Sequence, residues 1–534
     1  MKQVRMTLNE MLRKSAEAGM RRTALIYFGR KISYQRLVHE TDQIAAALQS
    51  MGIKKGDRVA VFLPNCPQFI IAYFGILRAG GIVTSTSPIY TAREAAHQWQ
   101  DAGASVVFAD RALAHVVREA LVACPGVRCV VWTGADDYRT QKASSRRNPS
   151  SPGPAAAGPG LRELEWDHLL RSGGKIRPVK VRPSDIACLQ YTGGTTGTSK
   201  GAMLTHGNLT TNAQQTADWL SGGNSERETF VATLPLFHIY ATTCVMITAI
   251  HCGGCVIILP RFELEPVLEA IRTHRPTFFH GVPTMYVAFN SVPDLRKYGL
   301  HKLRVCMSGG APLPTSVQAE FEKLTGAKLV EGYGLTEASP VTHVNPPGTS
   351  RAGSIGCLVQ GTQAKIVHTL RGGPPLPIGK EGELCIKGPQ VMKGYWGKPR
   401  ETAKVLKKGW LHTGDIARQD REGYFYIVDR KKDLILVGGF NVYPREVEEA
   451  LFEHPLIREA GVVGVPDSYR GEAVKAFVVL KPGARLSPDE IVTHCRQRLA
   501  AYKVPRHVEF RESLPKSGVG KYLRRELRKP NPGS

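Results

Sequence analysis

The sequence predicts an α/β protein with a large N-terminal domain of layered parallel sheets and helices, a β-rich subdomain, and a small mobile C-terminal α+β domain. Three observations lead to this prediction. Short apolar runs alternate with helical patterns through most of the chain, β-rich patterns follow Ile355, and a compact α/β unit follows the charged break at Arg430–Asp433. A chain of 534 residues is also too long for a single hydrophobic core.

The first part of the chain alternates apolar strands with amphipathic helices. Leu37, Ile44 and Leu48 recur at helical spacing, and Gly52 ends that helix. The predicted elements are strands at 24–28 and 31–33 around a glycine turn, a helix at 34–51, a strand at 57–63, a helix at 66–79, a strand at 82–84, a helix at 92–102 and a strand at 104–109. Strands that alternate with helices in this way indicate a parallel sheet.

The same alternation resumes after residues 144–160, where prolines and small polar residues predict a flexible surface loop. Further predicted elements are strands at 185–191, 229–234, 278–281 and 303–308, a helix at 208–220, strands at 364–367, 382–387 and 423–428, a helix at 444–452, strands at 459–465 and 473–480, and a helix at 487–499. We therefore expect an N-terminal domain over 1–429, a hinge at 430–433 and a mobile C-terminal domain over 434–534.

An uncharged run from Ile239 to Leu259 approaches the length of a membrane-spanning helix. A histidine and two adjacent glycines within it instead predict a buried helix, a turn and a buried strand at 255–259. Cys252 and Cys255 have the C-x-x-C spacing, but they lie in this apolar run without a second pair. We interpret them as buried thiols rather than a redox or metal pair.

The composition is that of a globular protein, with 42% apolar and 22% charged residues. The 11 cysteines show no disulfide-framework spacing, and no signal peptide is visible, which predicts a reducing, cytoplasmic setting. The net charge is +25, yet the basic residues are spread rather than interleaved with aromatic ones, which argues against nucleic-acid binding. Contact with an anionic membrane surface and a generally solvated basic surface stay open as alternatives.

The segment Tyr191–Gly201, Y-T-G-G-T-T-G-T-S-K-G, has the composition of a phosphate-binding loop. Its glycines let backbone N–H groups approach an anion, its hydroxyls add donors, and Lys200 adds a positive charge. It is not a Walker A loop, because Ser199 precedes the lysine and glycine follows it. On turn chemistry alone, a flexible surface turn is the alternative.

Ligands of parallel sheets bind at the carboxyl ends of the strands. The predicted strands end at Tyr191–Gly201, His238, His280–Pro283, Ser308–Pro312 and Glu331–Glu337. These five segments are therefore the candidate ligand site.

The set of motifs resembles the adenylate-forming enzymes, which include acyl-CoA synthetases, luciferases and peptide-synthetase adenylation domains. The resemblance covers nearly the whole chain. It rests on Tyr191–Gly201, on E-G-Y-G-L-T-E at Glu331–Glu337, on W-L-H-T-G-D at Trp410–Asp415, on the hinge motif at Asp429–Asn441 and on L-P-K-S-G-V-G-K at Leu514–Lys521. The one departure is Val519, where the family usually has serine or threonine, while Lys521 is kept.

The resemblance implies that a carboxylate joins the α-phosphate of ATP, releasing pyrophosphate, and that the acyl group then passes to coenzyme A. Because two anions meet, the site must supply positive charge. The resemblance gives this role to Lys521, a donor role at the α-phosphate to Thr336, and Mg²⁺ binding to the hard oxygen ligands Glu337 and Thr192. His238 would gate the acyl pocket, with a core histidine as the alternative.

The resemblance also implies how nucleotide and coenzyme A are held. Tyr333 would lie against adenine, Asp415 would accept from both ribose hydroxyls, and Lys200 would clamp the departing phosphates. Rotation about Lys432 would withdraw the C-terminal lysine and present a glycine pair to the pantetheine arm. The residues implied to bind ATP or coenzyme A are Thr192, Gly193, Gly194, Thr195, Thr196, Gly197, Lys200, Gly310, Ala311, Glu331, Gly332, Tyr333, Gly334, Asp415, Arg430, Lys432, Gly438 and Gly439.

The acid is inferred from resemblance alone. Ser87–Arg93 and Pro235–Tyr240 look most like bacterial long-chain fatty acid–CoA ligases, and His238 stands where amino-acid-activating relatives place an aspartate. A medium- or long-chain fatty acid is therefore predicted, with an aryl acid of the 4-coumarate type as the alternative. A non-catalytic relative that only binds ATP or acyl groups is a further alternative, which the intact acidic and lysine motifs disfavour. Peripheral membrane contact and a homodimer stay open.

Overall fold

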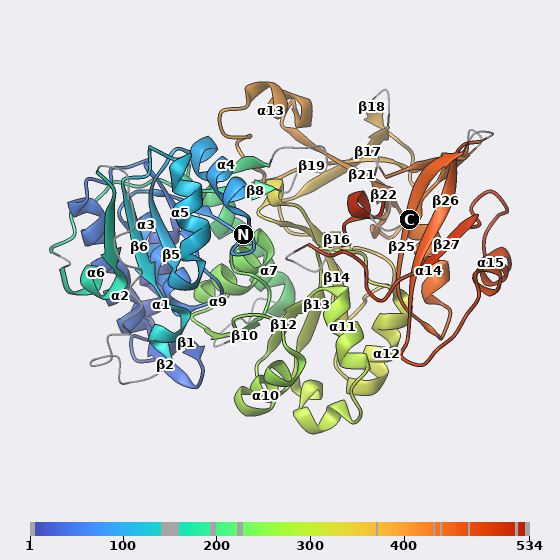
Figure 1. The fold of residues 1–534 in the computed structure, drawn as a ribbon, viewed down its shortest axis with the longest axis horizontal. Coiled ribbons are helices and arrows are strands. Elements are labelled where there is room, and N and C mark those ends of the chain that lie inside the picture. Colours follow the sequence, from blue (N-terminus) through green and yellow to red (C-terminus); the bar gives the residue numbers. More distant parts are fainter. Residues whose placement is uncertain are drawn as a thin grey trace.

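The structure is a computed structural model that describes residues 6–139, 160–172, 174–192, 199–221, 228–369, 372–430, 433–437, 440–467, 470–517 and 522–528. The predicted surface loop at 144–160 falls outside these ranges except for Gly160. The described chain forms four sheets, and the predicted α/β class is confirmed. In Figure 1, a blue-to-green sheet lies at one end of the molecule, the orange and red C-terminal unit lies at the other, and a β-rich sheet lies between them.

The first sheet has seven strands, which are parallel except for the last pair. Apolar residues alternate between its two faces along β5, so that Phe108 packs on one face and Val107 on the other. In spatial order the strands are β7 (Arg162–Glu165), β6 (Cys129–Thr133), β5 (Ala104–Asp110), β3 (Arg58–Phe62), β4 (Ile82–Ser85), β8 (Ile186–Thr192) and β9 (Lys200–Thr205).

Helices cover both faces of this sheet. One face packs against α4 (Ala92–Ala102) and α5 (Ala114–Val122). The other packs against α2 (Tyr34–Ser50) and α3 (Pro67–Arg78), with α6 (Trp166–Ser172) against α2. The predicted helix at 92–102 has the bounds of α4, because a Thr91–Glu94 capping box begins it and Gly103, at φ 65°, ends it.

The second sheet has nine strands and a parallel centre with antiparallel edges. In spatial order they are β16 (Cys357–Leu358), β15 (Val341–Val344), β14 (Leu329–Gly334), β13 (Val305–Ser308), β12 (Phe278–Gly281), β10 (Thr229–Ala232), β11 (Cys255–Ile258), β1 (Thr23–Tyr27) and β2 (Arg30–Ser33). The helices that adjoin these strands along the chain are α1 (Leu8–Glu17), α7 (His206–Ser221), α8 (Ile239–Ala241), α9 (Thr248–His251), α10 (Leu264–His274), α11 (Pro283–Asn290) and α12 (Thr315–Thr325). One continuous hydrophobic core joins the two large sheets.

The apolar run at 239–259 forms a helical stretch, a turn and a strand, as predicted. A π-helical segment at Thr242–Ile247, which the sequence did not indicate, separates α8 from α9. Cys252 and Cys255 are partly buried rather than fully buried as predicted. Desolvation nevertheless raises the pKa of Cys255 to about 12, which argues against a reactive thiol. Among the described residues, none of the helices has the length and apolar character needed to cross a bilayer.

The β-rich sheet contains β17 (Gln363–His368), β18 (Gly372–Pro375), β19 (Gly382–Lys387), β20 (Leu406–Lys407), β21 (Trp410–Gln419) and β22 (Phe425–Arg430), with α13 (Pro399–Val405) beside it. The C-terminal unit contains β23 (Ile435–Val437), β24 (Phe440–Val442), β25 (Ile457–Asp467), β26 (Gly471–Leu480), β27 (His507–Phe510), α14 (Pro444–Phe452), α15 (Pro488–Arg496) and α16 (Arg524–Leu527). This unit has its own hydrophobic clusters.

The element that follows the glycine-rich segment after β8 differs from the prediction. The sequence suggested that the segment runs directly into the helix at 208–220. Instead the chain first forms β9, which pairs antiparallel with β8, and Thr192 is paired with Lys200. The segment therefore joins two antiparallel strands, and α7 begins only at His206.

Candidate functional site

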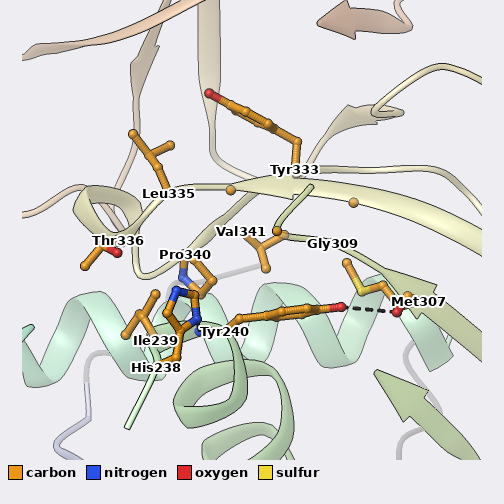
Figure 2. Close-up of a pocket in the computed structure, with 13 residues that line it drawn as sticks. His238, Ile239, Tyr240, Met307, Gly309, Tyr333, Leu335, Thr336, Pro340 and Val341 are labelled. Atoms are coloured by element: carbon orange, nitrogen blue, oxygen red, sulfur yellow. Dashed lines mark hydrogen bonds between the residues drawn. The ribbon is translucent and has the colours of Figure 1, made fainter. Parts of the chain in front are cut away.

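A pocket lies at the carboxyl ends of β13 and β14, next to the segment that follows β10. Figure 2 shows His238, Ile239, Tyr240 and Met307 on one side of the β14 strand and the Tyr333 ring on the other. The pocket is lined by His238, Ile239, Tyr240, Met307, Gly309, Gly310, Gly332, Tyr333, Gly334, Leu335, Thr336, Pro340 and Val341. It therefore brings together three of the five segments that the sequence placed at strand ends.

His238 begins the short helix α8. Its ring Nδ1 accepts a hydrogen bond from the backbone N–H of Tyr240, 3.3 Å away. Because Nδ1 acts as the acceptor, a neutral imidazole carries its proton on Nε2. The Tyr240 hydroxyl donates to the backbone oxygen of Met307 at 3.2 Å, which fixes the aromatic wall of the pocket (Figure 2).

Glycines form much of the pocket wall because side chains would not fit there. A Cβ on Gly309 would lie 3.1 Å from the Tyr240 ring, and one on Gly332 would lie 2.1 Å from Met307 Cε. A Cβ on Gly334 would lie 2.3 Å from the backbone oxygen of Pro340. Exposed backbone without side chains suits a flat group such as adenine. Gly310 also lines the pocket, whereas Ala311, next in the chain, lies outside the lining.

Asp415 lies on β21 directly opposite Arg430 on β22. One carboxylate oxygen lies 3.1 Å from Arg430 Nε, and the other accepts a hydrogen bond from the Tyr333 hydroxyl. The Asp415 carboxylate raises the pKa of Arg430. The pKa of Tyr333 is raised mainly by burial and to a smaller extent by the Asp415 carboxylate. Three predicted nucleotide-binding residues are thus joined in one network around the buried Asp415 carboxylate, with Arg430 exposed on its outer side. A ribose that donates to Asp415 has to share both oxygens with these partners.

Thr336 and Glu337 lie on a single 3₁₀ turn at Thr336–Ala338, directly after β14. Thr336 faces the pocket, and Glu337 Oε1 accepts a hydrogen bond from the Tyr395 hydroxyl at 2.7 Å. A carboxylate and a threonine hydroxyl are hard oxygen donors of the type that Mg²⁺ prefers. The chemistry of Glu337 and Thr192 therefore fits the metal predicted for this site.

Lys200 has an internal partner. Its Nζ lies 2.6 Å from Glu401 Oε2 on α13, while the other oxygen of Glu401 binds Lys404 at 2.6 Å. These two lysines lower the pKa of Glu401 to about 2. A phosphate that is to bind Lys200 has to compete with this carboxylate.

Glu331, on β14, is 5% exposed and connects the pocket strand with the C-terminal unit. Its Oε1 lies 4.0 Å from Nη2 of Arg445 on α14. Burial raises the pKa of Glu331 to about 7, although Arg445 opposes this shift. Arg445 also donates to the backbone oxygen of Ile427 at 2.8 Å, so this side chain joins three parts of the structure.

We expect the free energy of unfolding of Glu331→Gln to increase relative to that of the wild type as the pH rises from 5 to 8. An unfolded glutamate titrates near 4.5, whereas the folded one titrates near 7, so folded wild-type protein holds an extra proton between these values and loses stability as the pH rises. The full difference is on the order of 3 kcal/mol. Melting temperatures of the wild type and of Glu331→Gln across this pH range measure the effect. A variant whose melting temperature does not rise relative to that of the wild type between pH 5 and 8 would contradict the prediction.

Several predicted site residues fall outside the described ranges: Gly193, Gly194, Thr195, Thr196, Gly197, Lys432, Gly438, Gly439 and Lys521. The structure does place residues that the sequence did not single out. Met307 and Val341 line the pocket, while Tyr395 and Glu401 bind predicted site residues. Tyr395 lies 58 residues from its partner Glu337, beyond the reach of any local pattern.

Comparison with known proteins places the chain in a family. It matches AMP-binding enzyme over residues 12–396 and AMP-binding enzyme C-terminal domain over residues 446–521. A long-chain-fatty-acid–CoA ligase of Bacillus subtilis (strain 168) is 46% identical over 533 residues, covering 98% of this chain and 94% of the relative.

Two solved structures have the same architecture. An anthranilate CoA ligase in complex with anthranoyl-AMP has a TM-score of 0.88 at 26% identity, covering 98% of this chain and 97% of that chain. ATP-bound MatB from Rhodopseudomonas palustris has a TM-score of 0.85 at 29% identity, covering 98% of both chains. With the domain matches and the relative, these similarities show that the chain belongs to the family of AMP-binding enzymes.

Proposed function

We propose that this protein is an ATP-dependent ligase that joins a long-chain fatty acid to coenzyme A through an acyl-adenylate, releasing AMP and pyrophosphate. The observation that carries the proposal is the single pocket that unites His238, Thr336 and the glycine-lined wall with the apolar side chains of Met307 and Val341. The name of the 46% identical relative supports the choice of acid.

In the first half-reaction, a carboxylate oxygen of the acid bonds to the α-phosphorus of ATP while the bond from that phosphorus to pyrophosphate breaks. Thr336, on the pocket wall, would donate to a phosphate oxygen. Lys521 would place a positive charge beside the reacting carboxylate. Glu337 and Thr192 would hold Mg²⁺, which when bound neutralises phosphate charge and orients the leaving group. Asp415 and Tyr333 would position the nucleoside.

In the second half-reaction, the thiol of coenzyme A loses its proton to solvent and its sulfur attacks the acyl carbon, while the bond from that carbon to the AMP oxygen breaks. We propose a division into residues 1–429, a hinge at 430–433 and a mobile domain at 434–534. The separate hydrophobic clusters of the C-terminal unit support this division. Rotation about Lys432 would exchange Lys521 for Gly438 and Gly439, which leave room for a pantetheine arm.

ATP–pyrophosphate exchange with a panel of acids tests the substrate. We expect exchange with palmitate, less with octanoate, and little with cinnamate, anthranilate or an amino acid. Exchange with only the aryl acids would establish the alternative function, an aryl-acid–CoA ligase. Anthranilate, the acid named for the solved CoA ligase above, belongs to this class of acids. Absence of exchange with every acid would leave a non-catalytic relative, and release of ADP in place of AMP would exclude adenylate formation.

The location and assembly are also proposals. None of the 11 cysteines, all of which lie in the described ranges, forms a disulfide, as is usual for proteins of a reducing, cytoplasmic setting. Peripheral membrane contact is supported by the net charge of +25 and by Phe28, which is 46% exposed with the Arg139 guanidinium 3.7 Å from its ring centre. Co-sedimentation with phosphatidylglycerol but not phosphatidylcholine vesicles would support membrane contact.

The oligomeric state is a separate question. Light scattering during size-exclusion chromatography would decide between a monomer and a homodimer.

A further inference from the structure

The segment Met392–Lys404, here called the strap, crosses from the β-rich sheet to the pocket. Its backbone forms three hydrogen bonds with the hairpin strand β9: Met203 N–H donates to the Gly394 oxygen at 2.9 Å, Lys393 N–H donates to the Met203 oxygen at 3.0 Å, and Trp396 N–H donates to the Gly201 oxygen at 2.8 Å. It also binds the 3₁₀ turn, through Met392 N–H to the backbone oxygen of Glu337 at 2.8 Å. The strap therefore fixes two motifs that are far apart in the sequence.

Tyr395 lies at the centre of these contacts and is 8% exposed. Its hydroxyl donates to Glu337 Oε1 at 2.7 Å, and Lys200 Nζ lies 5.4 Å from the centre of its ring. One side chain thus contacts both the carboxylate expected to hold the metal and the lysine expected to hold phosphate.

We propose that Tyr395 is a positioning residue that fixes the Glu337 carboxylate, so that its second oxygen is presented to the divalent cation of the bound nucleotide. This inference rests on the proposed function, in which Glu337 is a metal ligand. The physical reason is rotamer freedom. A glutamate on a short surface turn samples several orientations, and a hydrogen bond to one oxygen selects among them before the metal arrives.

Tyr395→Phe removes the hydroxyl but keeps the ring that lies beside Lys200. Because loss of a hydrogen bond to a metal ligand typically weakens metal binding by about 10–100-fold, we expect the half-saturating Mg²⁺ concentration in ATP–pyrophosphate exchange to rise by about that factor. At saturating Mg²⁺ the rate should recover to within a few-fold of wild type. Mn²⁺ binding in the presence of a non-hydrolysable ATP analogue, followed by electron paramagnetic resonance, should weaken by the same factor without any turnover.

Tyr424→Phe is the matched control. Tyr424 is 7% exposed, and its hydroxyl donates to the backbone oxygen of Thr349 at 2.6 Å, away from the pocket lining. It should lose a buried tyrosine hydrogen bond without any change in metal dependence. A Tyr395→Phe enzyme with wild-type Mn²⁺ affinity, or with equal loss of rate at every Mg²⁺ concentration, would overturn the inference.

A second variant separates this inference from the proposed function. Glu337→Gln should abolish the Mg²⁺ response of exchange if Glu337 holds the metal. If Glu337→Gln keeps the wild-type response, the proposed metal site fails and this inference fails with it. If Glu337→Gln loses the response while Tyr395→Phe keeps it, the proposed site stands and only the positioning role of Tyr395 is overturned.

Discussion

Replacing Lys521 with alanine is expected to lower ATP–pyrophosphate exchange by about 10²–10³-fold, the typical cost of removing one group that stabilises transition-state charge. The attack of coenzyme A on supplied acyl-adenylate should stay within a few-fold of wild type, because in the proposed mechanism the rotation of the C-terminal domain has by then withdrawn this lysine. Single-turnover assays of each half-reaction measure the two effects separately.

Lys516 offers a control within the same motif. Its Nζ lies 2.9 Å from Glu459 Oε1, and its backbone pairs with Tyr522, next to Lys521 in the chain. Lys516→Ala should leave both half-reactions near wild type, since this lysine already has a partner inside the C-terminal unit. Equal losses in both half-reactions for Lys521→Ala would contradict the two-state mechanism.

The second large effect is expected for Asp415→Asn. The amide nitrogen cannot accept from Arg430 or from Tyr333, so one of these two groups loses its partner on residue 415. We expect the dissociation constant for ATP to rise by about 10²-fold, equivalent to about 3 kcal/mol. Isothermal titration of the folded variant with ATP measures this change independently of catalysis.

Asp420→Asn is the corresponding control, since Asp420 also pairs with an arginine and a tyrosine. Its Oδ2 lies 2.8 Å from Arg351 Nη1 and 3.1 Å from the Tyr426 hydroxyl, in the β-rich sheet and outside the pocket lining. This variant should lose stability while binding ATP as wild type does. If both variants bind ATP equally well, Asp415 does not contact the nucleoside.

Elements with clear end signals could be predicted from the sequence. The helix at 444–452 has the bounds of α14, because Pro444 is suited to the first helical position. Strands at 278–281 and 382–387 have the bounds of β12 and β19, because each contains adjacent apolar residues that the sheet buries.

Elements that depend on tertiary contacts could not be predicted. Lys200–Thr205 follows a glycine-rich segment and has a mixed composition, and it becomes β9 because β8 and the strap supply its hydrogen-bond partners. The π-helical segment at Thr242–Ile247 has the same apolar character as an ordinary buried helix. Sequence pattern therefore does not indicate its wider turn.

The site divides in the same way. His238, Thr336, Glu337 and Asp415 follow strands or lie in motifs, so their side chains could be named from the sequence. Their partners could not be named, because Tyr395 and Glu401 reach the site through the strap and α13, and both lie far from it along the chain.

The contact between Glu331 and Arg445 links domain movement to proton uptake. Arg445 lowers the pKa of Glu331, and burial keeps that pKa near 7. If the C-terminal domain rotates as proposed and carries α14 away, Glu331 loses both Arg445, which lowers its pKa, and Glu449, which raises it, so the proton affinity of this carboxyl group would differ between the two conformations. The equilibrium between the two conformations would then depend on pH near neutrality.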